Sequence, residues 1–248
     1  MNKISGLFTL SIVFLASSAQ AGTMGPISTQ DWIWVGAISA GAAWGNSGTT
    51  QTINLTPDIE KTYTADKSSK AFFDGEVFLG MQTALSQIIQ GQLGVAVGVT
   101  SDAKLNGEIW DDADPEFNNF TYSYKLQHTH IAVKGKLLAD IDFILMPWVS
   151  ASLGVGFNDA YGFRSTPVIF EALSTPDFSS HVETSFTYTF GAGIQKALNN
   201  NWQVGIGYEF ADWGRSRLGR AEGQTSSSHL SLNHFYTNGV LFNLTYLA

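Results

Sequence analysis

The chain has 248 residues, with 13 Lys and Arg against 21 Asp and Glu, and it contains no cysteine. This acidic balance argues against binding to nucleic acid, which favours basic stripes, and the missing cysteines exclude disulfides as a source of stability. Charged residues make up only 14% of the chain, against a usual share of about 25%, so part of the surface is expected to face something other than water.

The first 21 residues have the features of a secretory signal peptide. Lys3 supplies a positive charge, residues 7–16 form an apolar stretch, and Ala19 and Ala21 place small side chains where a signal peptidase cuts. The apolar stretch is shorter than the roughly 20 residues that a membrane-spanning helix needs. We therefore expect residues 1–21 to be cleaved and residues 22–248 to fold as one exported domain.

After residue 30, large apolar residues alternate repeatedly with small or polar ones. Residues 202–210 (WQVGIGYEF) place large apolar side chains on one face and Gln, Gly and Glu on the other. Successive side chains of a strand point to opposite faces, so this period predicts strands. The pattern predicts eight strands, each longer than the usual length of about 5–6 residues: 31–44, 71–84, 92–105, 120–137, 143–157, 183–196, 202–213 and 229–247.

The predicted connections alternate between short and long. Short turns are expected at 86–91, 139–142 and 197–201, and long loops at 45–70, 106–119, 158–182 and 214–228. Short periplasmic turns and longer extracellular loops are typical of outer-membrane barrels. The predicted fold is therefore all-β: an eight-stranded antiparallel up-and-down transmembrane β-barrel.

A soluble sandwich or a lipocalin-like barrel is the alternative, with the apolar faces packed inward around a core. The second face of the predicted strands is rich in Gly, Ala, Ser and Thr, which suits a narrow polar interior better than a solvated surface. Aromatic residues also gather near strand ends, as in the girdles at membrane interfaces. They are Trp32, Trp34 and Trp202 at one end, and Trp44, Trp110, Tyr122, Tyr124 and Trp213 at the other.

The last ten residues, 239–248 (GVLFNLTYLA), resemble the C-terminal assembly signal of outer-membrane proteins. Phe242, Leu244 and Tyr246 carry the alternating pattern, with Ala248 where that family usually has Phe. Together with residues 148–157 and 208–214, the chain is similar to the outer membrane protein A-like superfamily of small barrels. The resemblance implies the outer membrane of a Gram-negative bacterium, contact with its lipid and lipopolysaccharide, and recognition by the barrel-assembly machinery.

If the apolar faces meet lipid, the charges on the opposite faces must point into the barrel. A Lys or Arg facing lipid at mid-bilayer would cost about 2–4 kcal/mol. Opposite charges in a narrow interior pair to offset their desolvation. We therefore predict an interior polar network of Asp74, Glu76, Lys134, Glu209 and His130. It forms either a structural plug or the lining of a narrow, gated pore.

Two pairs of residues that include histidine have spacings found at catalytic or metal sites. His229 and Ser231 have the His-x-Ser spacing of lipid A deacylases, but no acid that would orient the histidine can be assigned from the sequence. His128 and His130 share a face without a third ligand that would complete a metal site. We therefore expect no enzymatic activity, no cofactor and no metal.

The long loops are the predicted place of function, because recognition often lies on loops that a rigid scaffold positions. Tyr63, Tyr161 and Phe170 are the predicted contact residues for a surface ligand. The sequence thus predicts a structural or surface-interaction role. A narrow ion-conducting pore and a lipid A-modifying enzyme are the alternatives.

Overall fold

Antiparallel strands account for nearly all the regular structure of the computed structural model, which describes residues 32–248 except 47, 68–69, 142 and 171–176. The predicted signal peptide lies outside the described residues. The one helical element among the described residues is a 3-10 turn, η1 (Pro115–Phe117), and no described helix is long and apolar enough to cross a membrane. The predicted all-β, antiparallel class is confirmed.

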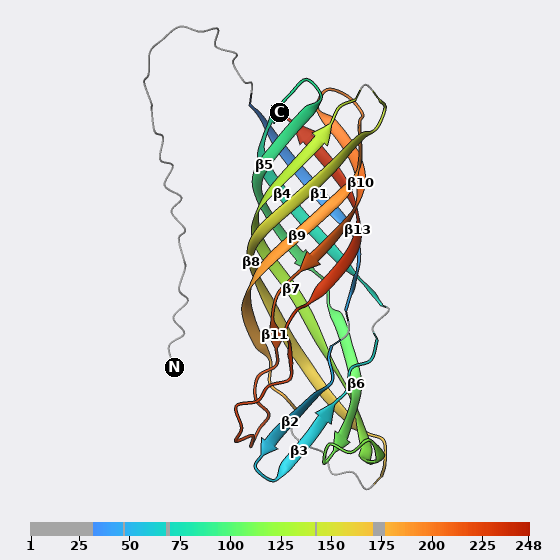
Figure 1. The fold of residues 1–248 in the computed structure, drawn as a ribbon, viewed down its shortest axis with the longest axis vertical. Helices are drawn as coiled ribbons and strands as arrows, with labels where there is room; N and C mark the ends of the chain where they lie inside the picture. The colour runs from blue at the N-terminus through green and yellow to red at the C-terminus, as the bar shows by residue number, and fades with distance from the viewer. Residues whose placement is uncertain (1–31, 47, 68–69, 142, 171–176) are drawn as a thin grey trace, which may run out of the picture. The chain divides into compact units, whose positions relative to one another are not determined.

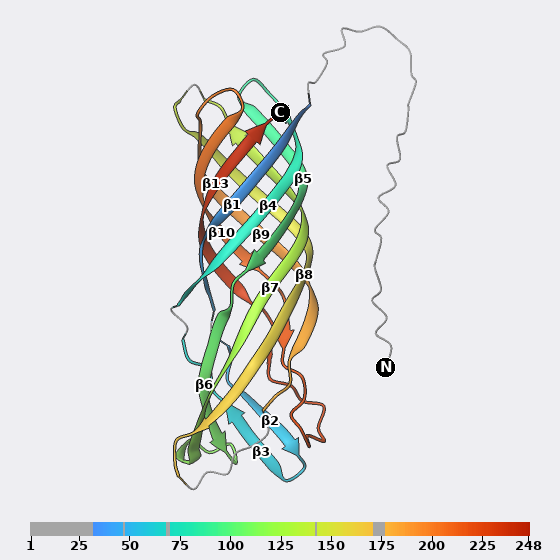
Figure 2. The same ribbon diagram turned by 180° about the vertical axis from the view of Figure 1, so that it is seen from behind.

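The main sheet is built from long strands that pair in a circuit. They are β1 (Ile33–Gly45), β4 (Ala71–Ala84), β5 (Ile89–Thr100), β7 (Asn118–Ala139), β8 (Met146–Pro167), β9 (His181–Ala197), β10 (Trp202–Asp212) and β13 (Tyr236–Leu247). Pairing follows the order β7–β5–β4–β1–β13–β10–β9–β8, and β8 pairs in turn with β7. The strands tilt around a common axis, as the front and back views show (Figures 1 and 2).

Burial alternates along the strands of this circuit, as period two requires. On β7, for example, His130, Ala132 and Lys134 are buried, whereas Ile131 and Val133 are 49% and 58% exposed. We call the buried side the inner face and the exposed side the outer face. The outer face is therefore apolar although it is the exposed one, and the inner face carries most of the polar side chains.

The ends of the circuit differ. Short connections at 85–88, 140–145 and 198–201 join β4 to β5, β7 to β8 and β9 to β10 at the end where the last strand finishes (Figure 1). We call this the turn end. The opposite loop end contains the long connections, and strands were expected in none of them.

That expectation is wrong, because the connections at 45–70 and 106–119 contain paired strands. They are β2 (Gln51–Thr56), β3 (Ile59–Tyr63) and β6 (Ala103–Asp111). The strand predicted over 92–105 breaks at Ser101 and Asp102, and β6 begins as a separate strand that pairs with β7. β7 and β8 are each 22 residues long and extend farther toward the loop end than predicted. We call β2, β3, β6 and residues 118–126 and 158–167 of β7 and β8 the platform.

The platform has an apolar core of its own. The rings of Tyr63 and Tyr122 lie 5.7 Å apart between centroids, and the ring of Phe163 lies 6.4 Å from the first and 5.6 Å from the second. The ring of Phe178 lies 5.5 Å from Tyr63 and 5.1 Å from Phe163. The core continues to Trp213, in the connection between β10 and β13. Two expectations are therefore corrected. Tyr122, Tyr124 and Trp213 are buried core residues and belong to no girdle, and Tyr63, expected to contact a ligand, is 2% exposed.

Candidate functional site

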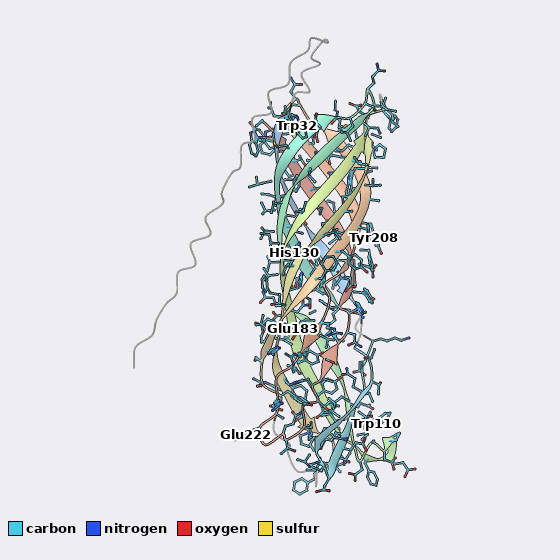
Figure 3. The ribbon with its side chains drawn as sticks, turned by 60° about the vertical axis from the view of Figure 1, so that its left-hand side comes forward. Trp32, Trp110, His130, Glu183, Tyr208 and Glu222 are labelled. Atoms are coloured by element: carbon cyan, nitrogen blue, oxygen red, sulfur yellow. The ribbon has the colours of Figure 1, made fainter. Side chains whose placement is uncertain are left out.

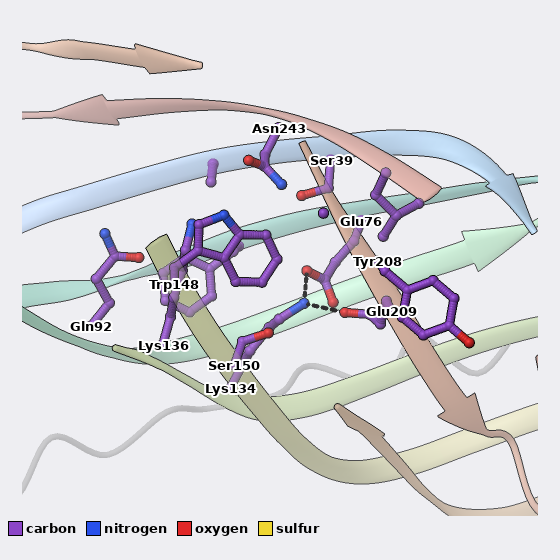
Figure 4. Close-up of a pocket in the computed structure, with 14 residues that line it drawn as sticks. Ser39, Glu76, Gln92, Lys134, Lys136, Trp148, Ser150, Tyr208, Glu209 and Asn243 are labelled. Carbon is purple, nitrogen blue, oxygen red and sulfur yellow. Dashed lines mark hydrogen bonds and ion pairs between the residues drawn. The ribbon is translucent and has the colours of Figure 1, made fainter. Parts of the chain in front are cut away.

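A buried ion cluster lies on the inner face of the main sheet, where three strands that are distant in sequence bring charges together. Lys134 Nζ on β7 lies 2.6 Å from Glu76 Oε1 on β4 and 3.0 Å from Glu209 Oε2 on β10 (Figure 4). All three side chains are about 11% exposed or less. The outer-face neighbour Tyr208 points away from them in the same view. One cation between two carboxylates makes this cluster a cross-link between opposite parts of the circuit.

The other two residues predicted for this network lie beside it. His130 Nε2 is 3.7 Å from Glu76 Oε2, and His130 is four residues from Lys134 on the same face of β7. Asp74 is 6% exposed and occupies the inner-face position two residues from Glu76 toward the loop end. The structure therefore brings all five predicted residues to one inner face, with the strongest contacts at Lys134.

A second polar layer, which the sequence analysis missed, lies toward the turn end. Lys136 Nζ lies 4.6 Å from the ring centroid of Trp148, and it donates to Gln195, which in turn donates to Gln203. Gln92 donates to Gln82 Oε1 at 2.7 Å. The sequence did contain a sign of this layer, because each of these residues falls on the polar side of the alternating pattern of its strand. Between this layer and the ion cluster is a cavity of about 40 Å³, enough for a few water molecules.

At the loop end of the inner face, Trp213 covers the two histidines of β7. Its ring centroid lies 4.1 Å from that of His128 and 4.8 Å from that of His130. Asn158 on β8 holds this arrangement, because its side-chain oxygen is 2.7 Å from His128 Nδ1 and its Nδ2 donates to the Trp213 carbonyl at 2.7 Å. The indole therefore closes the inner space between the ion cluster and the platform core.

Among the predicted contact residues, Tyr161 and Phe170 are accessible from outside. Phe170 is 99% exposed. Tyr161 lies on the outer face of β8 and donates from its hydroxyl to Asp102 Oδ1 at 2.6 Å, while Lys125 Nζ lies 2.8 Å from Asp102 Oδ2. The hydrogen bond to Asp102, with a smaller contribution from desolvation, raises the pKa of Tyr161 to about 12.

His229 and Ser231 do not share a long strand, contrary to the strand expected over 229–247. That strand, β13, begins only at Tyr236. Ser231 instead belongs to β12 (Ser231–Leu232), which pairs with β11 (Ser216–Arg217). Ser231 Oγ donates to Gln51 Oε1 at 3.3 Å. Within the described part of the chain, no group of three or more His, Cys, Asp or Glu side chains is placed to hold a metal ion.

The three residues of the predicted assembly signal, Phe242, Leu244 and Tyr246, lie on the outer face of β13. They are 63%, 42% and 41% exposed. Near the turn end, the ring of Tyr246 lies 4.9 Å from that of Trp202 on β10. Trp32, at the same end, lies far along the strands from Trp110 of β6 at the loop end (Figure 3).

Comparison with solved structures finds outer-membrane proteins. The outer membrane protease OmpT from Escherichia coli aligns with a TM-score of 0.50 at 10% identity, over 89% of this chain and 99% of that one. Neisserial surface protein A (NspA) aligns with a TM-score of 0.45 at 12% identity, over 86% and 96%. Ail of Yersinia pestis aligns with a TM-score of 0.33 at 15% identity, over 86% and 98%. No protein-family model matches the chain, and no curated protein matches it. The likeness to OmpT concerns the fold alone.

Proposed function

We propose that the chain is an outer-membrane protein of a Gram-negative bacterium and that the circuit of eight strands is a closed transmembrane barrel. The apolar outer face supports this proposal: Val133, Leu153 and Phe242, on three different strands, are each about 60% exposed. In a membrane, the apolar lipid chains would cover such a face and keep it out of water. Each strand of the circuit also has a partner on both sides, which leaves few unpaired backbone groups where water is absent.

The extent of the apolar face fits one bilayer crossing. On β8, the outer-face positions from Val149 to Phe157 are apolar or small, and Asp159 and Tyr161 follow toward the loop end. A tilted strand needs about 9–11 residues to cross the hydrocarbon core. Trp202 and Tyr246 at the turn end and Trp44 at the other suit the two interfaces, where amphipathic rings are favoured. We assign the turn end to the periplasm and the platform to the outside.

The platform carries our proposal of a surface-interaction role. Simple loops would be enough to connect the strands, yet here β7 and β8 remain paired beyond the apolar face and recruit β6, β3 and β2. A buried aromatic core then fixes the position of their outer side chains. A rigid, polar surface held away from the membrane is suited to bind a partner with little loss of conformational entropy.

The inner face supports a non-conducting barrel. Lys134 crosses the enclosed space to Glu76 and Glu209, the cavity beside them is about 40 Å³, and Trp213 covers the loop end. About eight strands leave an interior just filled by side chains. We therefore infer a structural plug and expect no sustained single-channel conductance in planar bilayers. Stable, discrete conductance from the purified protein would contradict this inference.

The orientation can be tested with single cysteines, because the natural chain contains none. Variants Phe170→Cys and Thr121→Cys place a thiol on the loop end, and Leu198→Cys places one on an exposed position of the turn end. On intact cells, a membrane-impermeant maleimide should label the first two. Leu198→Cys should be labelled only after the outer membrane is permeabilised. The opposite pattern, or no labelling at the loop end, would refute the proposed orientation.

A further inference from the structure

A polar pocket of about 460 Å³ lies at the loop end, between β9 and the β11–β12 hairpin, and nothing in the network above uses it. Its lining includes Glu183, Arg215, Ser216, Arg217, His229 and Ser231. Figure 3 places Glu183 along the strands between His130 and Glu222 of the loop end. The backbone of Arg215 is anchored there: its N–H donates to Ser185 Oγ at 3.0 Å, and its carbonyl accepts from Asn158 Nδ2 at 2.6 Å.

The pocket has an excess of positive charge in a chain whose net charge is −8. Its one carboxylate, Glu183, is already neutralised, since Arg217 Nε donates to Glu183 Oε2 at 2.7 Å and His181 Nε2 lies 3.1 Å from the same oxygen. Among the described residues, the guanidinium of Arg215 has no ion-pair or hydrogen-bond partner. Burial, together with the nearby Arg217 and Arg220, lowers the pKa of His229 below its ordinary value.

Two buried polar atoms of the pocket lack partners. Ser216 is 2% exposed, and its Oγ has no hydrogen-bond partner within the described chain; the same holds for Nδ1 of His229. Leaving a buried donor or acceptor unsatisfied destabilises the folded state, because the group has lost its water without gaining a partner. Native structures rarely leave such atoms unpaired unless a water, an ion or a ligand satisfies them. An oxygen atom of a bound ligand would accept a hydrogen bond from Ser216 Oγ, and another would accept from His229 Nδ1 in the tautomer that carries the proton there.

These groups define the chemistry of the ligand. Guanidinium groups match the oxygens of a phosphate in charge and in geometry, and a hydroxyl adds a neutral donor. The volume is within the range of small-molecule sites, about 300–1,000 Å³, and leaves room for a sugar ring. We propose that this pocket binds the phosphate ester of a sugar, with Arg215, Arg217 and Ser216 as the donors. The ligand is either a free sugar phosphate or the phosphorylated sugar of an outer-leaflet glycolipid.

The purified, folded full chain in phosphate-free micelles provides the direct test. Glucose 1-phosphate should bind in a calorimetric titration, and glucose should not. Arg215→Gln and Ser216→Ala should each weaken the binding, the former by about tenfold or more, because hydrogen bonds to charged groups are the stronger ones. Arg164→Gln is the matched control, since it removes an exposed arginine outside the pocket. Absence of binding by the natural chain, or equal losses in Arg215→Gln and Arg164→Gln, would overturn the proposal.

A second arm identifies the source of the phosphate. In nanodiscs of phosphatidylcholine with lipopolysaccharide, a glycolipid ligand should suppress glucose 1-phosphate binding relative to phosphatidylcholine alone. A free sugar phosphate should bind equally well in both. This proposal rests on the proposed function in one respect: the ligand reaches the pocket only if the loop end faces the outside of the cell. Maleimide labelling of Phe170→Cys tests that role separately, so failure of the role and failure of the site can be told apart.

Discussion

At the scale of single residues, the inner face depends most on Lys134, because its one positive charge is shared by two buried carboxylates. Replacing it by methionine keeps much of the volume but leaves Glu76 and Glu209 buried without a cation. Breaking a buried ion pair in this way costs about 3–5 kcal/mol. We expect Lys134→Met to lower the free energy of unfolding by about that amount in urea titrations followed by tryptophan fluorescence.

Two controls make this prediction specific. Lys104→Met removes the same charge from an exposed position of β6 and should change the free energy of unfolding by less than about 0.5 kcal/mol. The triple variant Glu76→Gln, Lys134→Met, Glu209→Gln should recover much of the loss, because it leaves no buried charge unpaired. A triple variant no more stable than Lys134→Met would show that unpaired buried charge is not the cause of the lost stability.

The outer-face pair of Tyr161 and Asp102 gives a pH-dependent prediction. The pKa of Tyr161 is raised from 10.0 to about 12, so the folded protein favours the neutral phenol. Its contribution to stability is therefore complete below pH 10 and disappears as the pH rises through about 12. Asp102→Asn should bring the pKa of Tyr161 back toward its ordinary value. The phenolate absorbance of each protein, minus that of its Tyr161→Phe counterpart, measures this pKa; an unchanged value would contradict the assignment.

The residues that sequence could and could not identify differ in a physical way. The alternation along a strand decides which face a side chain takes. It was therefore enough to assign five residues to the inner face: Asp74, Glu76, Lys134, Glu209 and His130. The alternation does not show what covers that face. The contact of Trp213 with the histidines depends on how the connection between β10 and β13 folds back. Burial of Tyr63 likewise depends on platform pairings that no local pattern reveals.

At the scale of elements, the apolar outer face predicts a strong dependence on position. Leu153 lies halfway between Val149 and Phe157 on β8 and is 58% exposed. In a bilayer, Leu153→Arg should cost about 2–4 kcal/mol, because an arginine facing lipid at mid-bilayer loses its hydration. Thr121→Arg, on the exposed face of the platform, should cost almost nothing. Unfolding in phospholipid vesicles measures both, and equal costs would mean that Leu153 does not face lipid.

The elements themselves were predictable where apolar residues alternate without interruption, as in β10 and β4. The prediction failed where a strand continues in a new direction. Ser101 and Asp102 are short polar residues that end β5, yet the alternation resumes directly with Ala103 and Leu105 buried. A single period-two run therefore covers two strands, which both pair with β7 but have different second partners, β4 for β5 and β3 for β6. The platform hairpin of β2 and β3 was missed because its strands have only 6 and 5 residues.

At the scale of the whole molecule, the circuit of strand pairings predicts that a circularly permuted chain will still fold. Val35 pairs with Leu247, and the N–H of Ala248 donates to the Trp34 carbonyl at 2.9 Å, so β1 begins beside the end of β13. A short linker from 248 to 32, with new termini between Asn199 and Asn200 in a short turn, should preserve the fold. New termini between Gly205 and Ile206, inside β10, should prevent it. Faster gel mobility without boiling than after boiling distinguishes the folded product.

The pairing of β1 with β13 has a further consequence for how the chain is completed. Until β13 is in place, β1 and β10 each present an unpaired row of backbone N–H and C=O groups, and β13 later pairs with both. Such rows are templates for aggregation. A product truncated before Tyr236 would therefore be prone to aggregate, because the loss of β13 leaves both β1 and β10 with an unpaired edge. β13 is thus the strand that closes the row of pairings between β1 and β10.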